Sequence, residues 1–274
     1  DIARGLLDEP GDGPAPLVGY VVRSTEARAR LRRIDAAAAR AAPGVHRVLL
    51  AEDAMRAGLS PTHPHQPVNV QTGEPFRYAP QPRLAQDEVR YVGEAVAFVV
   101  ADSVADALTA ADRLVIDYEP LPAVVGTQAA AASAAPQICE GVADNTCLDW
   151  SYGDRPGTRS ALGAAARVVT LDVHNHRIAH NAMEPRGALG WYDPGGDLYR
   201  LELSSQNVHV IRDHIAASLG TTPERVRVTA PDVGGGFGVR NFVYGDYVLV
   251  LWAARECGRT VRWVHARSDG FVSD

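Results

Sequence analysis

The sequence predicts an α+β or α/β protein of two domains, and three observations support this prediction. Its 274 residues leave room for one large domain or two ordinary ones. Hydrophobic residues make up 46% of the chain and charged residues 22%, a balance typical of a packed core. Strand-type and helix-type patterns alternate on both sides of an alanine-rich stretch between Gly126 and Pro136. We therefore divide the chain into domains over 1–130 and 131–274.

The spacing of apolar residues and the positions of turn residues predict the first secondary-structure elements of the first domain. Apolar residues over 18–22 recur at period two and predict a strand, and 45–50 is a second segment of strand type. Between them, the alanine-rich segment 27–42 favours a helix by propensity, and the Pro-Gly pair at 43–44 predicts its end. Proline and glutamine dominate 61–82, which predicts a long irregular loop.

A strand–helix–strand unit completes the first domain. The uninterrupted apolar run over 95–100 predicts a strand buried on both faces. Ser103 and Asp106 have capping-box spacing ahead of an amphipathic helix over 104–111. The apolar segment 114–118 predicts the strand that follows.

The second domain is predicted to begin with a β-rich stretch over 166–191, followed by a strand over 198–203. Apolar residues spaced three and four apart over 208–219 predict a helix with one buried face. Apolar residues alternate with charged or polar residues over 226–230, which predicts a half-buried strand. The segment 244–257 is apolar on nearly every face, so its helix should be buried.

Charge and cysteine content exclude several classes of function. The formal net charge of −6 argues against nucleic acid or an anionic membrane surface as the main partner. No apolar run approaches the roughly 20 residues of a membrane span. Cys139, Cys147 and Cys257 are odd in number and lack Cys-x-x-Cys spacing, which argues against a disulfide scaffold and a zinc or iron–sulfur site.

A glycine-rich run from Gly234 to Gly238, between a predicted strand and a predicted helix, is the most informative segment. Backbone N–H groups with no side chains in the way can approach an anion or an oxo group. Val239 stands where a dinucleotide fingerprint needs its third glycine, and no Lys-Ser or Lys-Thr of a P-loop follows. The alternative is a tight turn with only a structural role.

Gln206 lies where a strand gives way to a helix, a place from which a polar side chain can enter a crevice. A neutral amide donor suits recognition of an oxo or carbonyl oxygen without adding charge. The alternative is a surface glutamine at a strand end.

Two further polar groups favour structural roles. Glu184 and Arg186 are predicted to form a buried ion pair. His174, His176 and His180 would share one face of a strand, but no cysteine or acidic residue is placed as a fourth zinc ligand. We therefore expect no protein-ligated metal.

Several motifs occur in a fixed order along the chain. They are Val92–Ala97, Asp117–Val124, Met183–Gly187, Ser205–His209, Pro231–Gly238 and Gly258–Trp263. As a set they closely resemble the molybdopterin-binding large subunit of the xanthine dehydrogenase family of molybdenum hydroxylases. That family includes aldehyde oxidoreductases, aerobic carbon monoxide dehydrogenase and N-heterocycle hydroxylases. The resemblance covers essentially the whole chain and implies an α/β hammerhead domain followed by the first part of the molybdopterin-binding domain.

The resemblance also implies roles for particular residues. Gln206 matches the glutamine that hydrogen-bonds the apical oxo ligand of molybdenum. Gly235, Gly236, Phe237 and Gly238 match the loop whose N–H groups hold the metal centre and whose Phe shapes the substrate pocket. In this family the pterin dithiolene binds the metal, which explains why the sequence shows no metal-ligand cluster.

The chain also departs from the family pattern. No residue matches the catalytic glutamate near the C-terminal end of family members, so we expect no catalytic base in this chain and no activity of the chain alone. The sequence resembles a piece of a longer protein. Arg240 stands where lysine is common, and Asn241 stands where purine-oxidising members carry a glutamate, which argues against a xanthine-specific site.

The resemblance implies hydroxylation of an aldehyde or N-heterocycle with oxygen from water, and electron transfer to iron–sulfur clusters. The implied cofactor is molybdopterin, with the cytosine dinucleotide form as one option, and [2Fe-2S] and FAD would reside on partner subunits. The implied partners are the remaining large-subunit sequence, an iron–sulfur subunit and a flavin subunit. The expected location is the cytoplasm, with periplasmic export through a partner as the alternative. A non-catalytic scaffold half-subunit is the alternative function.

Overall fold

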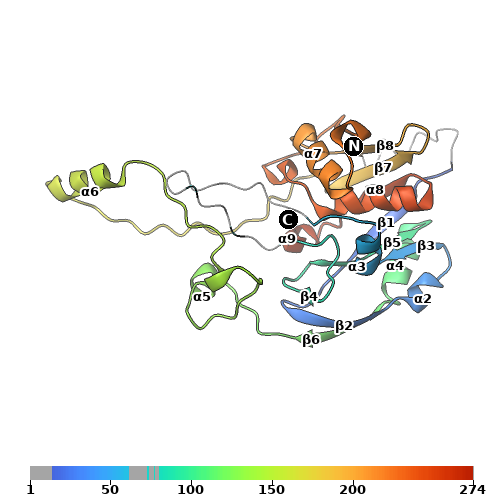
Figure 1. The fold of residues 1–274 in the computed structure, drawn as a ribbon, viewed down its shortest axis with the longest axis horizontal. Coiled ribbons are helices and arrows are strands. Elements are labelled where there is room, and N and C mark those ends of the chain that lie inside the picture. Colours follow the sequence, from blue (N-terminus) through green and yellow to red (C-terminus); the bar gives the residue numbers. More distant parts are fainter. Residues whose placement is uncertain (1–13, 62–72, 74–76, 78–79, 274) are drawn as a thin grey trace. The chain divides into compact units, whose positions relative to one another are not determined.

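The computed structural model describes residues 14–61, 73, 77 and 80–273. It divides into two compact units, which we describe separately (Figure 1). The first comprises Asp1–Thr62, Pro80–Ala123 and Ala179–Asp274, and the second comprises His63–Ala79 and Val124–Ile178. Most of the loop predicted over 61–82 lies outside the described residues.

The strands are β1 (Leu17–Arg23), β2 (Ala29–Asp35), β3 (Val45–Leu49), β4 (Glu88–Val89), β5 (Ala95–Ala101), β6 (Val115–Pro120), β7 (Gly187–Asp193), β8 (Leu198–Leu203), β9 (Val226–Thr229) and β10 (Val261–Val264). The α-helices are α2 (Ala37–Arg40), α3 (Ala51–Arg56), α4 (Val104–Ala111), α5 (Thr127–Ala130), α6 (Arg155–Ala164), α7 (Val208–Ser218), α8 (Gly245–Cys257) and α9 (Gly270–Ser273). The 3₁₀ turns are η1 (Ala143–Asn145), η2 (Pro223–Arg225) and η3 (Val239–Asn241).

A seven-stranded mixed sheet organises the first unit, in the order β3-β5-β1-β10-β7-β8-β9. The pairs β1–β10 and β8–β9 are parallel, and the other neighbours are antiparallel. Pairing of Leu17 with Val261 joins strands from the two ends of the chain. The sheet thus takes strands from both sides of residue 130. The division into domains over 1–130 and 131–274 stays a prediction.

The core lies on both faces of this sheet. Phe98 and Val100 of β5 pack into a cluster with α7 and α8, whereas Val99 packs with α4 on the opposite face. This arrangement confirms the prediction that 95–100 is a strand buried on both faces. The middle of α8 is buried on all sides, as its continuous apolar sequence predicts.

Local capping signals are also confirmed. The Ser103 hydroxyl accepts the Asp106 N–H at 3.1 Å and begins α4 as predicted. Asn207 begins α7 by accepting the N–H of Val210 at 3.3 Å, and Gly220 follows its end with a φ of +64°. The left-handed region favours glycine just after a helix because glycine has no Cβ to clash there.

The helix predicted over 27–42 is wrong. Ala29–Asp35 forms β2, the central strand of a three-stranded antiparallel sheet in the order β4-β2-β6, and only the single turn of α2 remains helical. Ala29 is fully buried, and Leu31 and Ile34 pack against the same small core. Helix propensities differ by less than about 1 kcal/mol per residue, so burial and pairing of this strand override them.

The β-rich stretch predicted over 166–191 is wrong over most of its length, because regular strand structure begins only at Gly187. Val169, Leu171 and Val173 are 84, 81 and 78% exposed. Alternating apolar residues form a stable strand only where a neighbouring strand accepts and donates the backbone hydrogen bonds. No strand in the described part of the chain pairs with residues 166–186.

The second unit contains α5, η1 and α6. Its alanine-rich segment is held by Asn145, whose amide nitrogen donates to the carbonyls of Ala130 and Pro136 at 3.0 Å. The amide oxygen of Asn145 accepts the N–H of Ile138 at 2.9 Å. A single side chain therefore organises this turn. Among the described helices, none has the length and apolar character needed to cross a membrane.

Candidate functional site

The candidate site lies where β8 and β9 end. These two strands are parallel neighbours, with Tyr199 opposite Val226, so their carboxyl ends reach the same edge of the sheet. Gln206 follows β8, and the glycine loop, residues 234–238, follows β9. In α/β sheets, ligands commonly bind outside the carboxyl ends of the strands. The fold thus brings together Gln206 and the glycine loop, the two features selected from the sequence, although 27 residues of chain lie between them.

Gln206 contacts the glycine loop directly. Its Oε1 atom accepts the N–H of Gly238 at 3.0 Å, and its own N–H donates to the carbonyl of Arg240 at 3.1 Å. Because a backbone N–H can only donate, the amide oxygen must face Gly238, and the amide NH₂ group is then turned away from Gly238. The Gln206 side chain is exposed, so this NH₂ group is accessible to a ligand.

The glycine loop presents unused backbone donors. In the described part of the chain, no group accepts the N–H of Gly235, Gly236 or Phe237. Gly235 and Phe237 have φ of +113° and +51°, and Gly238 has φ of +88°. Successive N–H groups in loops that alternate left- and right-handed conformations form concave anion sites. Phe237 is 69% exposed, and a positive φ at a non-glycine residue is uncommon.

Two of the glycines are required by close approach. A Cβ at Gly234 would lie 2.5 Å from Cβ of Glu184, and a Cβ at Gly236 would lie 2.5 Å from Cδ of Gln206. Neither distance is compatible with van der Waals radii. The loop therefore packs directly on these two side chains.

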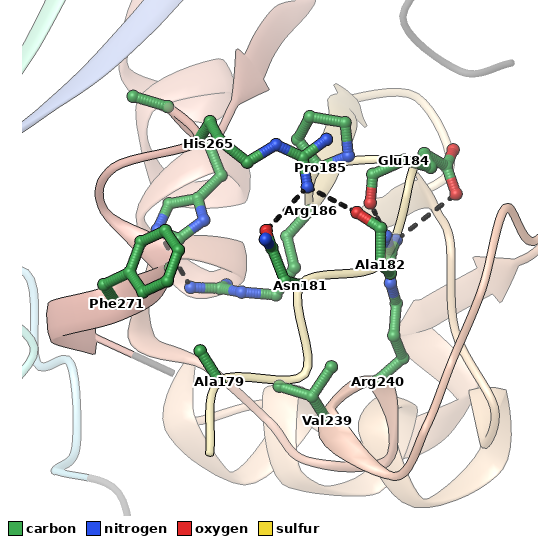
Figure 2. Close-up of a pocket in the computed structure, with 13 residues that line it drawn as sticks. Ala179, Asn181, Ala182, Glu184, Pro185, Arg186, Val239, Arg240, His265 and Phe271 are labelled. Carbon is green, nitrogen blue, oxygen red and sulfur yellow. Dashed lines mark hydrogen bonds and ion pairs between the residues drawn. The ribbon is translucent and has the colours of Figure 1, made fainter.

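The predicted Glu184–Arg186 pair is wrong, because each residue pairs with another partner. Glu184 Oε2 lies 3.4 Å from Arg240 Nη1 (Figure 2), and Arg186 Nη1 lies 3.1 Å from Asp246 Oδ2. Arg186 follows Glu184 by two residues at the start of β7, and the two side chains diverge to partners on different elements. The Arg186–Asp246 pair is buried, and Arg240 is a buried partner of the partly exposed Glu184.

Asp246, on the first turn of α8, is a residue that the sequence analysis missed. Its two carboxylate oxygens accept from Arg23 at 3.0 Å and from Arg186 at 3.1 Å. Burial alone would raise its pKa, but Arg23 and Arg186 outweigh burial and hold the pKa of Asp246 below its usual value. The Arg186 guanidinium also stacks 3.7 Å from the centre of the Tyr244 ring. An acidic residue directly before the apolar run of α8 was the signal available in the sequence.

A small cavity adjoins the site and is lined by Glu184, Arg186, Arg240, His265 and Phe271, among other residues (Figure 2). Its volume of about 30 Å³ is room for one or two water molecules. The cavity is therefore too small for a ligand of cofactor size.

No group of three His, Cys, Asp or Glu side chains among the described residues could hold a metal ion. The rings of His174 and His176 stack with centroids 4.4 Å apart, but residues 174–180 form no strand, so the strand face expected to carry the three histidines is absent from this described segment. The sheet edge thus brings together backbone N–H groups of the glycine loop and one neutral side-chain amide, that of Gln206.

Comparison with known proteins defines the class. Residues 138–274 match the molybdopterin cofactor-binding domain, and residues 11–122 match the aldehyde oxidase and xanthine dehydrogenase a/b hammerhead domain. The chain therefore belongs to the xanthine dehydrogenase family of molybdenum hydroxylases, as part of a molybdopterin-binding large subunit.

Individual relatives belong to several branches of this family. The carbon monoxide dehydrogenase large chain of Afipia carboxidovorans is 32% identical over 269 residues, covering 93% of this chain and 32% of the relative. The nicotine 6-hydroxylase large subunit of Paenarthrobacter nicotinovorans is 32% identical and covers 92% of this chain and 30% of its own length. The crystal structure of quinoline 2-oxidoreductase from Pseudomonas putida 86 matches 97% of this chain and 33% of that chain, at 32% identity and a TM-score of 0.82. The chain spans about a third of the length of these relatives.

Proposed function

We propose that Gln206 and the glycine loop hold the molybdenum cofactor of a hydroxylase of which this chain is the first portion of the large subunit. The observation that carries this proposal is the contact of Gln206 Oε1 with the Gly238 N–H, beside three N–H groups without an acceptor in the described chain. The site offers only neutral donors, which suits an oxygen-rich anionic group. Glycines at 234 and 236 allow the backbone to lie against Glu184 and Gln206 without steric clash.

The bound cofactor would supply the two-electron redox chemistry of hydroxylation with oxygen from water. The role of this chain is to bind and orient the cofactor. The glycine loop donates backbone hydrogen bonds to it, and the Gln206 amide donates to an acceptor atom of its metal centre. Phe237 stands exposed at the same loop and would form part of the substrate pocket. Preorganised neutral donors stabilise developing negative charge without having to reorient.

The chain alone is proposed to be inactive. The carboxylate that touches the glycine loop is that of Glu184, and it is already engaged by the Gly234 N–H at 2.8 Å and by Arg240. Both contacts hold this carboxylate against the loop and Arg240, so we assign it a structural rather than a catalytic role. The base would therefore come from large-subunit sequence outside this chain. Without such sequence, the chain would serve as a non-catalytic scaffold.

Substrate, partners and location are proposed at the level of class. The matched relatives include carbon monoxide, nicotine and aldehyde enzymes at 30 to 32% identity, so identity does not favour one of them. We propose an aldehyde or N-heterocycle as substrate and molybdopterin, or its cytosine dinucleotide form, as cofactor. Electrons would pass to [2Fe-2S] clusters and FAD on an iron–sulfur and a flavin subunit. The proposed location is the cytoplasm, with export through a partner subunit as the alternative.

The deciding measurement is the molybdenum and pterin content of the natively purified protein, with the co-purifying chains identified by mass. The proposal predicts near-stoichiometric molybdenum and large-subunit sequence that supplies the missing base. A preparation with neither molybdenum nor pterin would overturn the proposal and leave the scaffold function.

Gly236→Ala should lower the bound pterin per chain severalfold or more while changing the melting temperature little. The added Cβ would lie 2.5 Å from Gln206 Cδ, so the amide must move and release Gly238. The loop is at the surface, so little core packing is lost. Pterin content and thermal unfolding measure the two effects.

Gly163→Ala is a matched control, because its Cβ would enter open space within α6. This control should keep wild-type pterin content and equal or slightly higher stability. Equal pterin content in Gly236→Ala and wild type would contradict the proposed close packing of loop and amide.

A further inference from the structure

We propose that Glu184 is a positioning residue that holds both ends of the glycine loop in the shape that binds the cofactor. This inference rests on the proposed function for its consequence, but its geometric part can be tested without the cofactor. Glu184 precedes β7 and is distant in sequence from the loop, so only the fold brings it there.

The first end of the loop is held by a two-way backbone contact. Glu184 Oε2 accepts the N–H of Gly234 at 2.8 Å, and the Glu184 N–H donates to the Gly234 carbonyl at 3.3 Å. The missing side chain at Gly234 allows this approach, since a Cβ there would lie 2.5 Å from Glu184 Cβ. Gly234 is thus fixed in both position and orientation.

The second end is held through Arg240. Its guanidinium lies 3.4 Å from Glu184 Oε2 and also donates to the Glu184 carbonyl (Figure 2). The Arg240 side chain is only 1% exposed, so this pairing operates away from solvent screening. The Arg240 carbonyl in turn accepts the N–H of Gln206 at 3.1 Å and the Ser205 hydroxyl at 3.4 Å.

The Glu184 carboxylate therefore links the beginning of the glycine loop to Arg240, the second residue after the loop ends, and through Arg240 to the backbone of Gln206. The donors between these fixed points, at 235–237, have no partner in the described chain that could fix them directly. The geometry of these N–H donors therefore depends on how the two ends of the glycine loop are held. A glutamine at 184 could still accept from Gly234 but would remove the negative charge facing a buried guanidinium.

The test uses Glu184→Gln and Glu184→Ala in the purified complex that contains this chain. Hydrogen exchange of the peptide covering 232–240 reports loop opening, and pterin released during dialysis reports cofactor retention. The Mo(V) EPR spectrum of the loaded protein reports the surroundings of the metal. We expect exchange of this peptide to rise about tenfold and pterin retention to fall in Glu184→Gln, with a larger effect in Glu184→Ala.

Glu88→Gln is the matched control, because Glu88 accepts from Arg28 at 2.7 Å in the small sheet β4-β2-β6. This variant loses a largely buried Arg–Glu ion pair that does not contact the loop, and it should leave loop exchange, pterin retention and the EPR spectrum unchanged. A general loss of stability would affect both variants, whereas a positioning role affects only position 184. Circular dichroism checks that both variants fold.

Unchanged hydrogen exchange of residues 232–240 in both Glu184 variants would overturn the proposal that Glu184 holds the ends of the glycine loop. Faster exchange with wild-type pterin retention and EPR spectrum would overturn the positioning role and leave a purely structural contact. A wild-type protein without pterin would instead overturn the proposed function, and exchange would still decide whether Glu184 holds the loop.

Discussion

Gln206→Ala should reduce turnover by about 10²–10³-fold in protein with full molybdenum content, the loss typical of removing one preorganised donor from a polar catalytic site. The substitution removes the amide NH₂ group that we propose to contact the metal centre, and it also frees the Gly238 N–H. Gln206 is exposed, so the fold should remain intact. Steady-state rates normalised to molybdenum, together with circular dichroism, measure both effects.

Two variants sharpen this result. Gln206→Glu keeps an acceptor for Gly238 but replaces the NH₂ donor with negative charge, so it should be as inactive as Gln206→Ala. Asn207→Ala removes the cap of α7, whose side chain accepts from Val210, and should cost about 1 kcal/mol of stability with little effect on turnover. Wild-type turnover in fully loaded Gln206→Ala would refute the assigned role.

Asp246→Ala should lower the free energy of unfolding by about 3–5 kcal/mol, the largest stability effect expected in this chain. The carboxylate lies between Arg23 at 3.0 Å and Arg186 at 3.1 Å, and its removal leaves the buried Arg186 and the largely buried Arg23 without this counter-charge. Urea denaturation measures the difference. Asp197→Asn breaks an exposed pair with Arg225 at 2.9 Å and should cost at most about 1 kcal/mol. Equal losses in the two variants would contradict the role of burial.

The Asp246 carboxylate also makes the free energy of unfolding depend on pH. Because the folded-state pKa of Asp246 is lowered, its contribution is fully present above the unfolded pKa of about 3.9. It is lost as the pH falls through the folded-state value. The urea midpoint of the wild type should therefore fall more steeply below about pH 4 than that of Asp246→Asn. Parallel curves for the two proteins would show that Asp246 is not responsible.

Elements with strong local patterns were predictable from the sequence. The run over 95–100 forms β5, and the periodic segment 208–219 contains α7. In both, the hydrophobic period agrees with the burial that the fold provides. The two wrong predictions of secondary structure arose where local pattern and tertiary context differ. The alanine-rich segment 27–42 supplies β2 because pairing with β6 buries Ala29, and 166–186 has strand-type alternation but no neighbouring strand in the described structure.

The sequence by itself determined the family and the candidate residues at the sheet edge, Gln206 and Gly235–Gly238. The positive φ of Gly235 and Gly238 and the strand-to-helix connections are local requirements, so they leave a local record of glycines and polar residues. Only the tertiary structure decided which charges meet: Glu184 pairs with Arg240 rather than Arg186, and Asp246 joins Arg23 to Arg186. These partners lie 56 to 223 residues apart. Any buried carboxylate could satisfy any buried guanidinium, so residue types alone do not select the pairing, whereas the order of strands in the sheet does.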